Sequence, residues 1–250
     1  NLIRAAGEHG LRHVIVGNAS NILFDDRGFN GLVIFTTGLR GVYWKEDNVR
    51  AECGVSLTAL AGKAAERGLS GLEFAYGIPG TVGGAVYMNA GAYGAETADI
   101  LVSSEYLRDG ATLSRGKHEH EFAYRSSVYR KTGEVILSAT FLLTPDDAAA
   151  VKARSDANLR ARKEKQPLEY PNAGSIFKRP QGAFAGALIE DAGLKGLRIG
   201  GAAVSEKHAG FIVNLGGATT DDVLRLIEAV RSEVFKQTGV LLEPEVIHIQ

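Results

Sequence analysis

The stretch 73–96, EFAYGIPGTVGGAVYMNAGAYGAE, constrains this chain more than any other feature of its sequence. Its residues follow neither the 3.6-residue period of an amphipathic helix nor the alternation of a strand. We therefore predict a long ordered loop inside a compact domain, and such loops usually have a binding role. The chain has 31 glycines, many of them clustered, and glycine lets a ligand approach the backbone closely.

Composition excludes several classes of protein. Hydrophobic residues make up 45% and charged residues 23% of 250 residues, as in a soluble globular protein of one large or two small domains. The formal net charge of -1 gives no basic field for nucleic acid or a membrane surface. No apolar run reaches the roughly 20 residues of a spanning helix. One cysteine, Cys53, makes no intrachain disulfide, so we expect a cytoplasmic protein with Cys53 as a packing residue. A monomer is expected separately, although the sequence does not determine the oligomeric state.

Local patterns predict a mixture of helices and strands. Strands are expected over 13–17, 31–37, 99–107, 135–143 and 240–250, with hairpin turns near 46–48 and at 109–110, and helices over 57–67, 145–165, 183–192 and 220–237. Ser56 and Thr220 are the expected N-caps of two of these helices. The pattern indicates an α+β fold with two lobes, which we divide into domains 1–150 and 151–250.

A first candidate binding loop is VGNASNILFDD at 16–26, which follows a predicted strand. Gly17, Asn18, Ala19, Ser20 and Asn21 are small or turn-forming, so their backbone N–H groups can converge on an anion. The loop has neither the Gly-Lys-Ser/Thr of a P-loop nor the G-x-G-x-x-G of a dinucleotide fold. Phosphate binding and an ordinary turn both remain open for it.

The glycine-rich stretch is the second candidate loop. Its glycines at 77, 80, 83 and 84 open a path to the backbone, and Pro79 stiffens the turn. Tyr76, Tyr87, Tyr93 and Asn89 offer rings and an amide to a polar aromatic ligand. A glycine-rich lid without a ligand is the alternative. Together the two loops favour a large bound nucleotide.

Ser175 in PNAGSIFKRP, residues 171–180, has four possible roles. It could cap a helix, bind a phosphate beside Lys178 and Arg179, attack a carbonyl or deliver a proton. The G-x-S-x-G elbow of a nucleophile is absent because Phe177 occupies the second glycine position. Pro180 argues against a helix beginning here.

Two further charged residues are candidates. Arg125 in FAYRSSVYR can bind a carboxylate through two hydrogen bonds, although most arginines lie on the surface. Glu245 in LLEPEVIHIQ shares its strand face with Ile247 and Ile249, so it points inward if they do. A carboxylate in that position needs a partner or a raised pKa. A glutamate at the rim is the alternative.

The segment His118-Glu119-His120 carries two histidines but has no convincing third metal ligand. We therefore interpret it as a solvated turn and predict no metal site.

Six motifs together resemble one family. VGNASNILFDD, YGIPGTVGGAVYMNAGAYGAE, YRSS, QPLEYPNAGSIFKRP, AGALIEDAGLKGLRIGGAAVSEKHAGFIVN and LEPEV occur in the order seen in UDP-N-acetylenolpyruvoylglucosamine reductases. The resemblance covers essentially the whole chain. It is to the shorter subtype, which lacks an inserted substrate-covering loop, and it implies a further N-terminal segment of the flavin domain ahead of residue 1.

The resemblance implies a two-lobed FAD-binding domain of the vanillyl-alcohol-oxidase type, followed by an α+β substrate-binding domain. It implies that NADPH reduces FAD and that the flavin N5 gives a hydride to the enolpyruvyl double bond of UDP-N-acetylglucosamine enolpyruvate. The product is UDP-N-acetylmuramate, a peptidoglycan precursor. The expected partner is this small sugar nucleotide, and neither nucleic acid nor a membrane is expected.

The motif matches also imply roles for individual residues. Ser175 corresponds to the proton donor, and Arg125 and Glu245 to the residues that stabilise the enolate. Tyr124, Lys178 and Arg179 are expected to contact substrate. The expected FAD contacts are Gly17, Asn18, Ala19, Ser20, Asn21, Tyr76, Gly77, Ile78, Pro79, Gly80, Gly83, Gly84, Asn89, Gly91 and Ala92.

Two other functions remain as alternatives. An FAD oxidase of small alcohols or sugars would explain the two loops but not NAGSIFKRP and LEPEV. A nucleotide-binding regulatory module without turnover would not need Arg125, Ser175 and Glu245 together.

Overall fold

The computed structural model describes residues 2–250, which form two compact units. The first unit contains the chain up to Asn18 and the segment Gly31–Ala161, and the second contains Ala19–Asn30 and Arg162–Gln250. The domain boundary between residues 150 and 151 stays a prediction. Within residues 2–250, none of the helices has the length and apolar character needed to cross a membrane.

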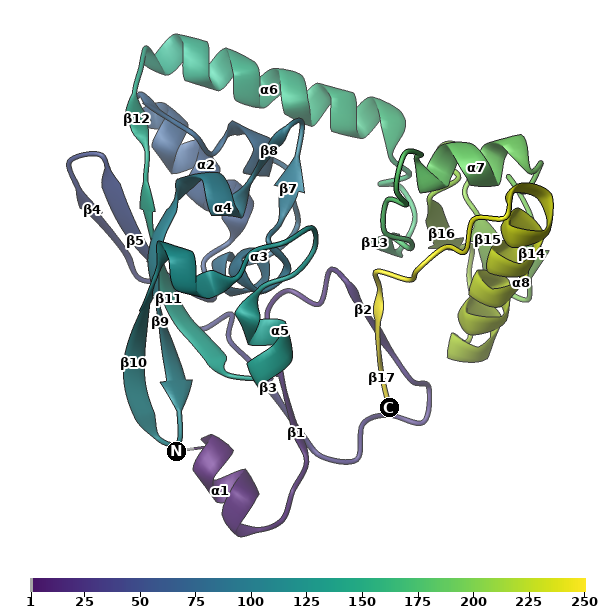
Figure 1. The fold of residues 1–250 in the computed structure, drawn as a ribbon, viewed down its shortest axis with the longest axis horizontal. Helices are drawn as coiled ribbons and strands as arrows, with labels where there is room; N and C mark the ends of the chain where they lie inside the picture. Colours follow the sequence, from purple (N-terminus) through teal and green to yellow (C-terminus); the bar gives the residue numbers. More distant parts are fainter. Residues whose placement is uncertain (1) are drawn as a thin grey trace. The chain divides into compact units, whose positions relative to one another are not determined.

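The first unit is built on an antiparallel five-stranded sheet (Figure 1). Its strand order is β10 (Ala111–Gly116), β9 (Leu101–Arg108), β11 (Val135–Leu142), β5 (Asn48–Glu52) and β4 (Val42–Lys45). Asp109 and Gly110, with φ of 52° and 80°, make the turn between β9 and β10. Glu46, with φ of 54°, begins the turn between β4 and β5. Both predicted hairpins are therefore confirmed.

Shorter strands complete the first unit. β1 (His13–Val16) pairs in parallel with β3 (Leu32–Phe35), and β6 (Leu69–Ser70) pairs with β12 (Thr144–Pro145). The strands β7 (Gly91–Ala92) and β8 (Ala95–Glu96) form a small hairpin. Two 3-10 turns, η1 (Glu73–Ala75) and η2 (Lys117–His120), follow β6 and β10.

The helices of the first unit are α1 (Leu2–Glu8), α2 (Leu57–Glu66), α3 (Val82–Met88), α4 (Thr97–Ile100) and α5 (Val128–Thr132). A further helix, α6 (Ala148–Lys165), runs from the first unit into the beginning of the second. The N-cap of α2 is Ser56, whose hydroxyl accepts a hydrogen bond of 3.3 Å from the Ala59 N–H, as predicted. Leu57, Leu60 and neighbouring alanines bury its apolar face in the core.

The glycine-rich stretch is ordered, as predicted, but it is not a loop throughout, because it contains α3. Thr81 caps this helix by accepting a hydrogen bond of 3.3 Å from the Gly84 N–H. The missing side chain of Gly83 lets the helix lie against β5, since an added Cβ would be 2.8 Å from the Cys53 Cβ. Cys53 is buried there, and burial raises the pKa of its thiol to about 11. Packing against Cys53, which the local pattern does not reveal, compensates for the low helix propensity of glycine.

The second unit has a four-stranded antiparallel sheet and two helices. The strand order is β13 (Asn172–Ser175), β16 (Phe211–Asn214), β15 (Ala202–Val204) and β14 (Arg198–Ile199), with helices α7 (Ala185–Asp191) and α8 (Thr220–Thr238). A separate parallel pair joins β2 (Ile22–Phe24) to β17 (Ile247–Ile249).

Helix α8 is the most regular helix of the second unit. Leu226, Ile227, Val230 and Val234 are buried along one face, as their spacing predicts. Its N-cap is Thr219 rather than the predicted Thr220. The Thr219 hydroxyl accepts a hydrogen bond of 3.1 Å from the Asp222 N–H, and the Asp222 carboxylate accepts one of 3.0 Å from the Thr219 N–H. Gly239 ends the helix with φ of 72°.

Candidate active site

In the first unit, the beginning of the first candidate loop lies against the glycine-rich stretch. The Asn18 side-chain amide donates a hydrogen bond of 2.6 Å to the Pro79 carbonyl. Gly17 faces the cap of α3, where an added Cβ would be 2.4 Å from the Thr81 hydroxyl oxygen. Only glycine allows this approach, so Gly17 and Asn18 lie against the glycine-rich stretch within the first unit.

Helix α2 holds the glycine-rich stretch from the side of the core. The Thr58 hydroxyl accepts a hydrogen bond of 3.1 Å from the Gly77 N–H and donates one of 3.0 Å to the Ile78 carbonyl. The Leu57 N–H donates a hydrogen bond of 3.0 Å to the Gly80 carbonyl. Gly77 has φ of 103°, a conformation that side chains rarely adopt. The predicted cofactor-contacting backbone is therefore fixed by the protein itself.

Asn89 connects this surface to the segment that carries Arg125. It is fully buried with φ of 44°, and its side-chain N–H donates a hydrogen bond of 3.2 Å to the Ala123 carbonyl. Its side-chain oxygen accepts one of 3.0 Å from the Ala98 N–H. Both ends of the amide therefore bind the protein, which makes Asn89 a link within the first unit.

Tyr124 and Arg125 form the tip of a tight turn. The turn is closed by two backbone hydrogen bonds between Ala123 and Ser126, of 3.1 and 3.0 Å. Arg125 has φ of 53°, a left-handed conformation that costs a residue with a side chain about 1–2 kcal/mol. Its guanidinium donates a hydrogen bond of 3.1 Å to the Gly91 carbonyl and lies 4.9 Å from the Tyr124 ring centre. The surrounding hydrogen bonds therefore hold Arg125 in a strained backbone conformation.

In the second unit, Ser175 ends strand β13. Gly174 before it has φ of 77°, and its N–H donates a hydrogen bond of 3.0 Å to the Asn172 side chain. Ser175 pairs with Phe211 of β16 after an irregularity in the strand, and its side chain is exposed. Ser175 therefore caps no helix, which removes one of its four possible roles.

Glu245 lies beside Ser175 because residues 243–245 pair with the segment that follows β13. The Glu245 N–H donates a hydrogen bond of 2.7 Å to the Ile176 carbonyl, and the Lys178 N–H donates one of 2.9 Å to the Glu243 carbonyl. The predicted strand 240–250 is reduced to β17, because the chain bends at Val246. The alternation from Ile247 to Glu245 that the sequence suggested is therefore interrupted.

The rest of the first candidate loop joins the same cluster. The Asn21 side chain donates a hydrogen bond of 3.1 Å to the Glu245 carbonyl, and the Ile247 N–H donates one of 3.0 Å to the Asn21 carbonyl. A Cβ added to Gly174 would be 3.7 Å from the Ser20 carbonyl oxygen. The second unit thus brings Ser20, Asn21, Ser175 and Glu245 together. Arg125 belongs to the first unit.

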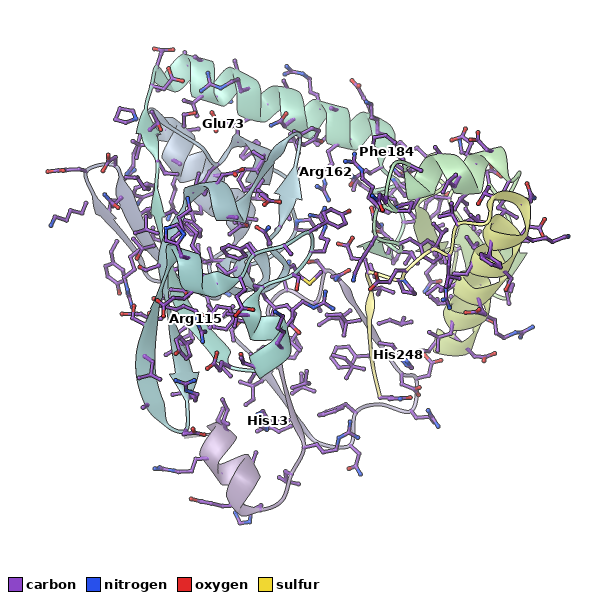
Figure 2. The ribbon with its side chains drawn as sticks, in the orientation of Figure 1. His13, Glu73, Arg115, Arg162, Phe184 and His248 are labelled. Atoms are coloured by element: carbon purple, nitrogen blue, oxygen red, sulfur yellow. The ribbon has the colours of Figure 1, made fainter. Side chains whose placement is uncertain are left out.

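The two basic residues after Ser175 have protein partners. Lys178 makes an ion pair with Glu243. The Arg179 guanidinium lies 4.1 Å from the ring centre of Phe184, the residue that precedes α7 (Figure 2). A substrate diphosphate that binds Lys178 or Arg179 would therefore share these side chains with Glu243 and Phe184.

The loop residues of the second unit fit a phosphate-bearing cofactor in their donor chemistry. Within the described residues 2–250, the backbone N–H groups of Ala19, Ser20 and Asn21 donate no backbone hydrogen bond. Ala19 has φ of 53°, which turns the backbone at this point. Successive N–H donors at such a turn suit the diphosphate of a dinucleotide.

The interpretation of 118–120 as a solvated turn is wrong for His120. His118 is exposed, whereas His120 is fully buried, and its ring Nε2 lies 2.7 Å from the Ser104 hydroxyl. Sequence reasoning missed this cluster because polar neighbours on both sides conceal the buried position. In the part of the chain that the structure describes, no group of three or more His, Cys, Asp or Glu side chains could hold a metal ion.

Comparison with known proteins gives two family matches along the chain. The FAD binding domain model matches residues 1–115, and the model of the UDP-N-acetylenolpyruvoylglucosamine reductase C-terminal domain matches residues 166–249. These matches confirm the predicted α+β arrangement of an FAD-binding domain followed by a C-terminal domain.

Relatives and a solved structure agree over nearly the whole chain. The UDP-N-acetylenolpyruvoylglucosamine reductase of Caldicellulosiruptor saccharolyticus is 50% identical over 249 residues, which is 98% of this chain and 80% of the relative. That of Pediococcus pentosaceus is 49% identical over 98% of this chain and 82% of its own length. The crystal structure of the reductase from Thermus caldophilus matches with a TM-score of 0.86 and 35% identity, covering 100% of this chain and 90% of that one. The chain is therefore an FAD-binding oxidoreductase, and it belongs to the UDP-N-acetylenolpyruvoylglucosamine reductase family.

Proposed function

We propose that this chain uses NADPH to reduce the enolpyruvyl group of UDP-N-acetylglucosamine enolpyruvate, which gives UDP-N-acetylmuramate. Bound FAD would supply the redox chemistry, which is the transfer of a hydride between NADPH and the enolpyruvyl double bond. Family membership, with relatives that carry the name of this reductase, supports the substrate class. The choice of NADPH and the roles of individual residues rest on the resemblance and on the chemistry below.

Two groups of residues would hold FAD. The donors of Ala19, Ser20 and Asn21 suit its diphosphate, because these N–H groups donate no backbone hydrogen bond within residues 2–250. Gly17 and Asn18, the stretch Tyr76–Gly80 with Gly83 and Gly84, and Gly91 with Ala92 would present backbone to the rest of the cofactor. Asn89 would act indirectly, because both ends of its amide bind the protein.

The substrate itself develops charge during the reaction. Hydride addition to one alkene carbon leaves an electron pair on the neighbouring carbon and its carboxylate, which is an enolate. Arg125 would bind this carboxylate through two hydrogen bonds, assisted by Tyr124 at the tip of the same turn. Glu245 would share the developing charge by a hydrogen bond in its protonated form. Lys178 and Arg179 would contact the substrate diphosphate.

Ser175 would then deliver a proton to the enolate carbon, which completes the addition of one hydride and one proton across the double bond. A serine is a weak acid in water, but correct placement compensates for part of this weakness. The observation that supports this role best is the pairing of Ile176 with Glu245, which holds the exposed Ser175 next to the carboxylate segment.

Anaerobic half-reactions of the FAD-loaded protein test the proposal. NADPH should bleach the flavin spectrum, and the enolpyruvyl sugar nucleotide should restore it with formation of UDP-N-acetylmuramate. UDP-N-acetylglucosamine, which has no double bond to reduce, serves as the control and should leave the flavin reduced. A reduced flavin that does not respond to the enolpyruvyl compound would refute the proposed function.

A further inference from the structure

A buried polar chain lies behind the Arg125 turn in the first unit. The Ser104 hydroxyl of β9 is 2.7 Å from His120 Nε2 and 2.5 Å from the Tyr129 hydroxyl of α5. Ser104, His120 and Tyr129 are each at most 1% exposed. Polar groups buried to this extent are costly unless their hydrogen bonds are complete, so the cluster fixes the positions of its members.

The hydrogen bond of His120 to the Lys117 carbonyl determines which atom donates in each of the other hydrogen bonds. His120 Nδ1 lies 3.2 Å from the Lys117 carbonyl, which can only accept, so Nδ1 carries the proton. Nε2 of the neutral ring is then an acceptor, and Ser104 donates to it. The Ser104 oxygen in turn accepts from the Tyr129 hydroxyl. Burial lowers the pKa of His120, which favours the neutral ring that this chain of hydrogen bonds needs.

A charged pair closes the other end of the cluster. Arg115 of β10 pairs directly across from Ser104 in the sheet, and its guanidinium lies 4.9 Å from the Tyr129 ring centre. It donates a hydrogen bond of 2.8 Å to Glu134. Figure 2 marks Arg115 on the part of the first unit that carries β10. Arg115 and Glu134 are both largely buried, so their ion pair lies inside the first unit beside Tyr129.

The cluster contacts both arms of the Arg125 turn. On the arm before the turn, the His120 ring stacks on Phe122 with centres 5.1 Å apart and planes 10° apart. On the arm after it, the same ring meets Tyr129 edge-on at 5.9 Å. One imidazole therefore holds the residues on either side of the strained Arg125.

The opposite side of the turn is attached to the candidate cofactor surface. The Ser127 hydroxyl donates a hydrogen bond of 2.8 Å to the Tyr87 carbonyl, and Asn89 holds the Ala123 carbonyl. Arg130 donates one of 2.8 Å to the Arg125 carbonyl. The turn is thus held on one side by α3 and on the other side by the buried cluster.

We propose that His120, Ser104 and Tyr129 are positioning residues that fix the turn of Arg125 in the geometry required to bind the substrate carboxylate. This inference rests on the proposed function of Arg125. The three residues do not touch the substrate. They maintain the left-handed backbone of Arg125, and a displacement of its guanidinium by about 1 Å is enough to slow a reaction about 10²-fold.

The test uses the FAD-loaded enzyme with Ser104→Ala, which removes the central hydroxyl, and Tyr129→Phe, which removes only the hydroxyl of an otherwise unchanged ring. Ser138→Ala is the matched control, because Ser138 is a buried serine of the neighbouring strand β11 that bonds Glu105 instead. In Ser104→Ala we expect NADPH to bleach the flavin normally and substrate reoxidation to slow about tenfold. Tyr129→Phe should have a smaller effect in the same half-reaction, and Ser138→Ala should have none.

A double-mutant cycle separates positioning from general packing. If the cluster acts through Arg125, Ser104→Ala causes no further slowing in an Arg125→Lys background. Equal slowing in both backgrounds, or equal slowing by Ser138→Ala, would overturn the inference.

Hydrogen exchange of the same holoenzyme measures the stability of the turn without relying on turnover. The backbone N–H groups of Ala123 and Ser126, which close the turn, should exchange faster in Ser104→Ala than in Ser138→Ala. Unchanged exchange at these two positions would also overturn the inference. If the unmodified holoenzyme is not reoxidised by substrate, the proposed function fails, and exchange still decides whether the cluster holds the turn.

Discussion

The side-chain amide of Asn21 donates a hydrogen bond to the backbone carbonyl of Glu245, 224 residues further along the chain. The Ile247 N–H returns a hydrogen bond to the Asn21 carbonyl, where β17 begins to pair in parallel with β2. One asparagine therefore connects a candidate phosphate-binding loop to the segment that carries a candidate catalytic carboxylate. The candidate loop and the Glu245 segment are therefore held to each other at Asn21.

This connection predicts a specific loss of stability in Asn21→Asp. The substitution keeps the shape but replaces the amide donor with a carboxylate that faces the Glu245 carbonyl. We expect the free energy of unfolding to fall by about 1–3 kcal/mol, measured by urea denaturation. Asn30→Asp introduces the same charge at an exposed position of the same unit and should change stability little. Equal losses in the two variants would mean that charge alone explains the effect.

Ser175→Ala should separate the two half-reactions. The proposed proton donor is not needed for NADPH to reduce the flavin, so bleaching should proceed at its normal rate. Reoxidation by the enolpyruvyl substrate should slow about 10²-fold or more, because a positioned acid contributes at least this much. Stopped-flow absorbance follows both steps, with Ser232→Ala on the exposed face of α8 as the control. Slowing of the first step alone would contradict the proton-donor role.

Arg125→Lys should impair substrate reduction more than its conserved charge suggests. A lysine cannot present two parallel N–H donors to a carboxylate. We expect the rate of flavin reoxidation to fall about 10²-fold, as when one preorganised donor to a developing anion is removed. The rate of bleaching by NADPH should stay unchanged. Near-normal kinetics of both steps would remove Arg125 from the site.

The left-handed backbone of Arg125 gives a separate prediction on stability. Glycine adopts a φ of 53° without strain, whereas alanine does not. Both Arg125→Gly and Arg125→Ala remove the guanidinium, so their comparison isolates the backbone. We expect the glycine variant to be more stable than the alanine variant by about 1 kcal/mol in urea denaturation, although both lose substrate reduction. If the alanine variant is the more stable one, the turn is not strained.

The elements that the sequence predicted well are those determined by neighbouring residues. Ser56 caps α2, and Asp109 with Gly110 turns the chain between β9 and β10, because caps and tight turns depend on a few consecutive side chains. Helix α3 was missed, since its stability depends on the contact of Gly83 with Cys53, which lies far away in sequence. A single-residue error at the N-cap of α8 has a simple cause, because Thr219 and Thr220 are adjacent.

The candidate site shows the same division. The order of the motifs nominated Arg125, Ser175 and Glu245, but it could not reveal that Glu245 pairs with Ile176 or that Asn21 holds its carbonyl. The burial of His120 was equally hidden, because the residues before and after it are polar. Long-range pairing and burial depend on tertiary structure, which local sequence patterns do not reveal.

Neighbouring glycines of α3 should respond to alanine in opposite ways. Gly83→Ala places a Cβ 2.8 Å from the Cys53 Cβ, whereas Gly84→Ala meets only the Thr81 hydroxyl at 3.6 Å, an ordinary contact. We expect Gly83→Ala to lower the free energy of unfolding by about 1–3 kcal/mol through overpacking. Gly84→Ala should leave it unchanged or raise it by up to about 1 kcal/mol, since alanine favours helices. The urea midpoints of the FAD-free variants measure both, and a shared sign would contradict the packing argument.

One buried histidine, His120, and one half-buried histidine, His208, predict how stability changes with pH. Burial is the main cause that lowers the pKa of both His120 and His208 from the ordinary value of 6.5. Below pH 6.5 the unfolded chain therefore takes up more protons than the folded protein, so the free energy of unfolding falls as the pH drops. Well above this pH both histidines are neutral in both states, and their contribution no longer depends on pH.

The contribution of His120 can be isolated by His120→Phe, which keeps an aromatic ring between Phe122 and Tyr129 but removes the titrating group. The variant loses the hydrogen bond to Ser104 and should be less stable than the parent at pH 8, where His120 is neutral. Between pH 6.5 and 5, however, its stability should decline less steeply than that of the parent, because one proton uptake on unfolding is lost. His118→Phe, at the exposed histidine of the same segment, is the control. Parallel stability curves for His120→Phe and the parent would show that His120 binds its proton equally well in the folded and unfolded states.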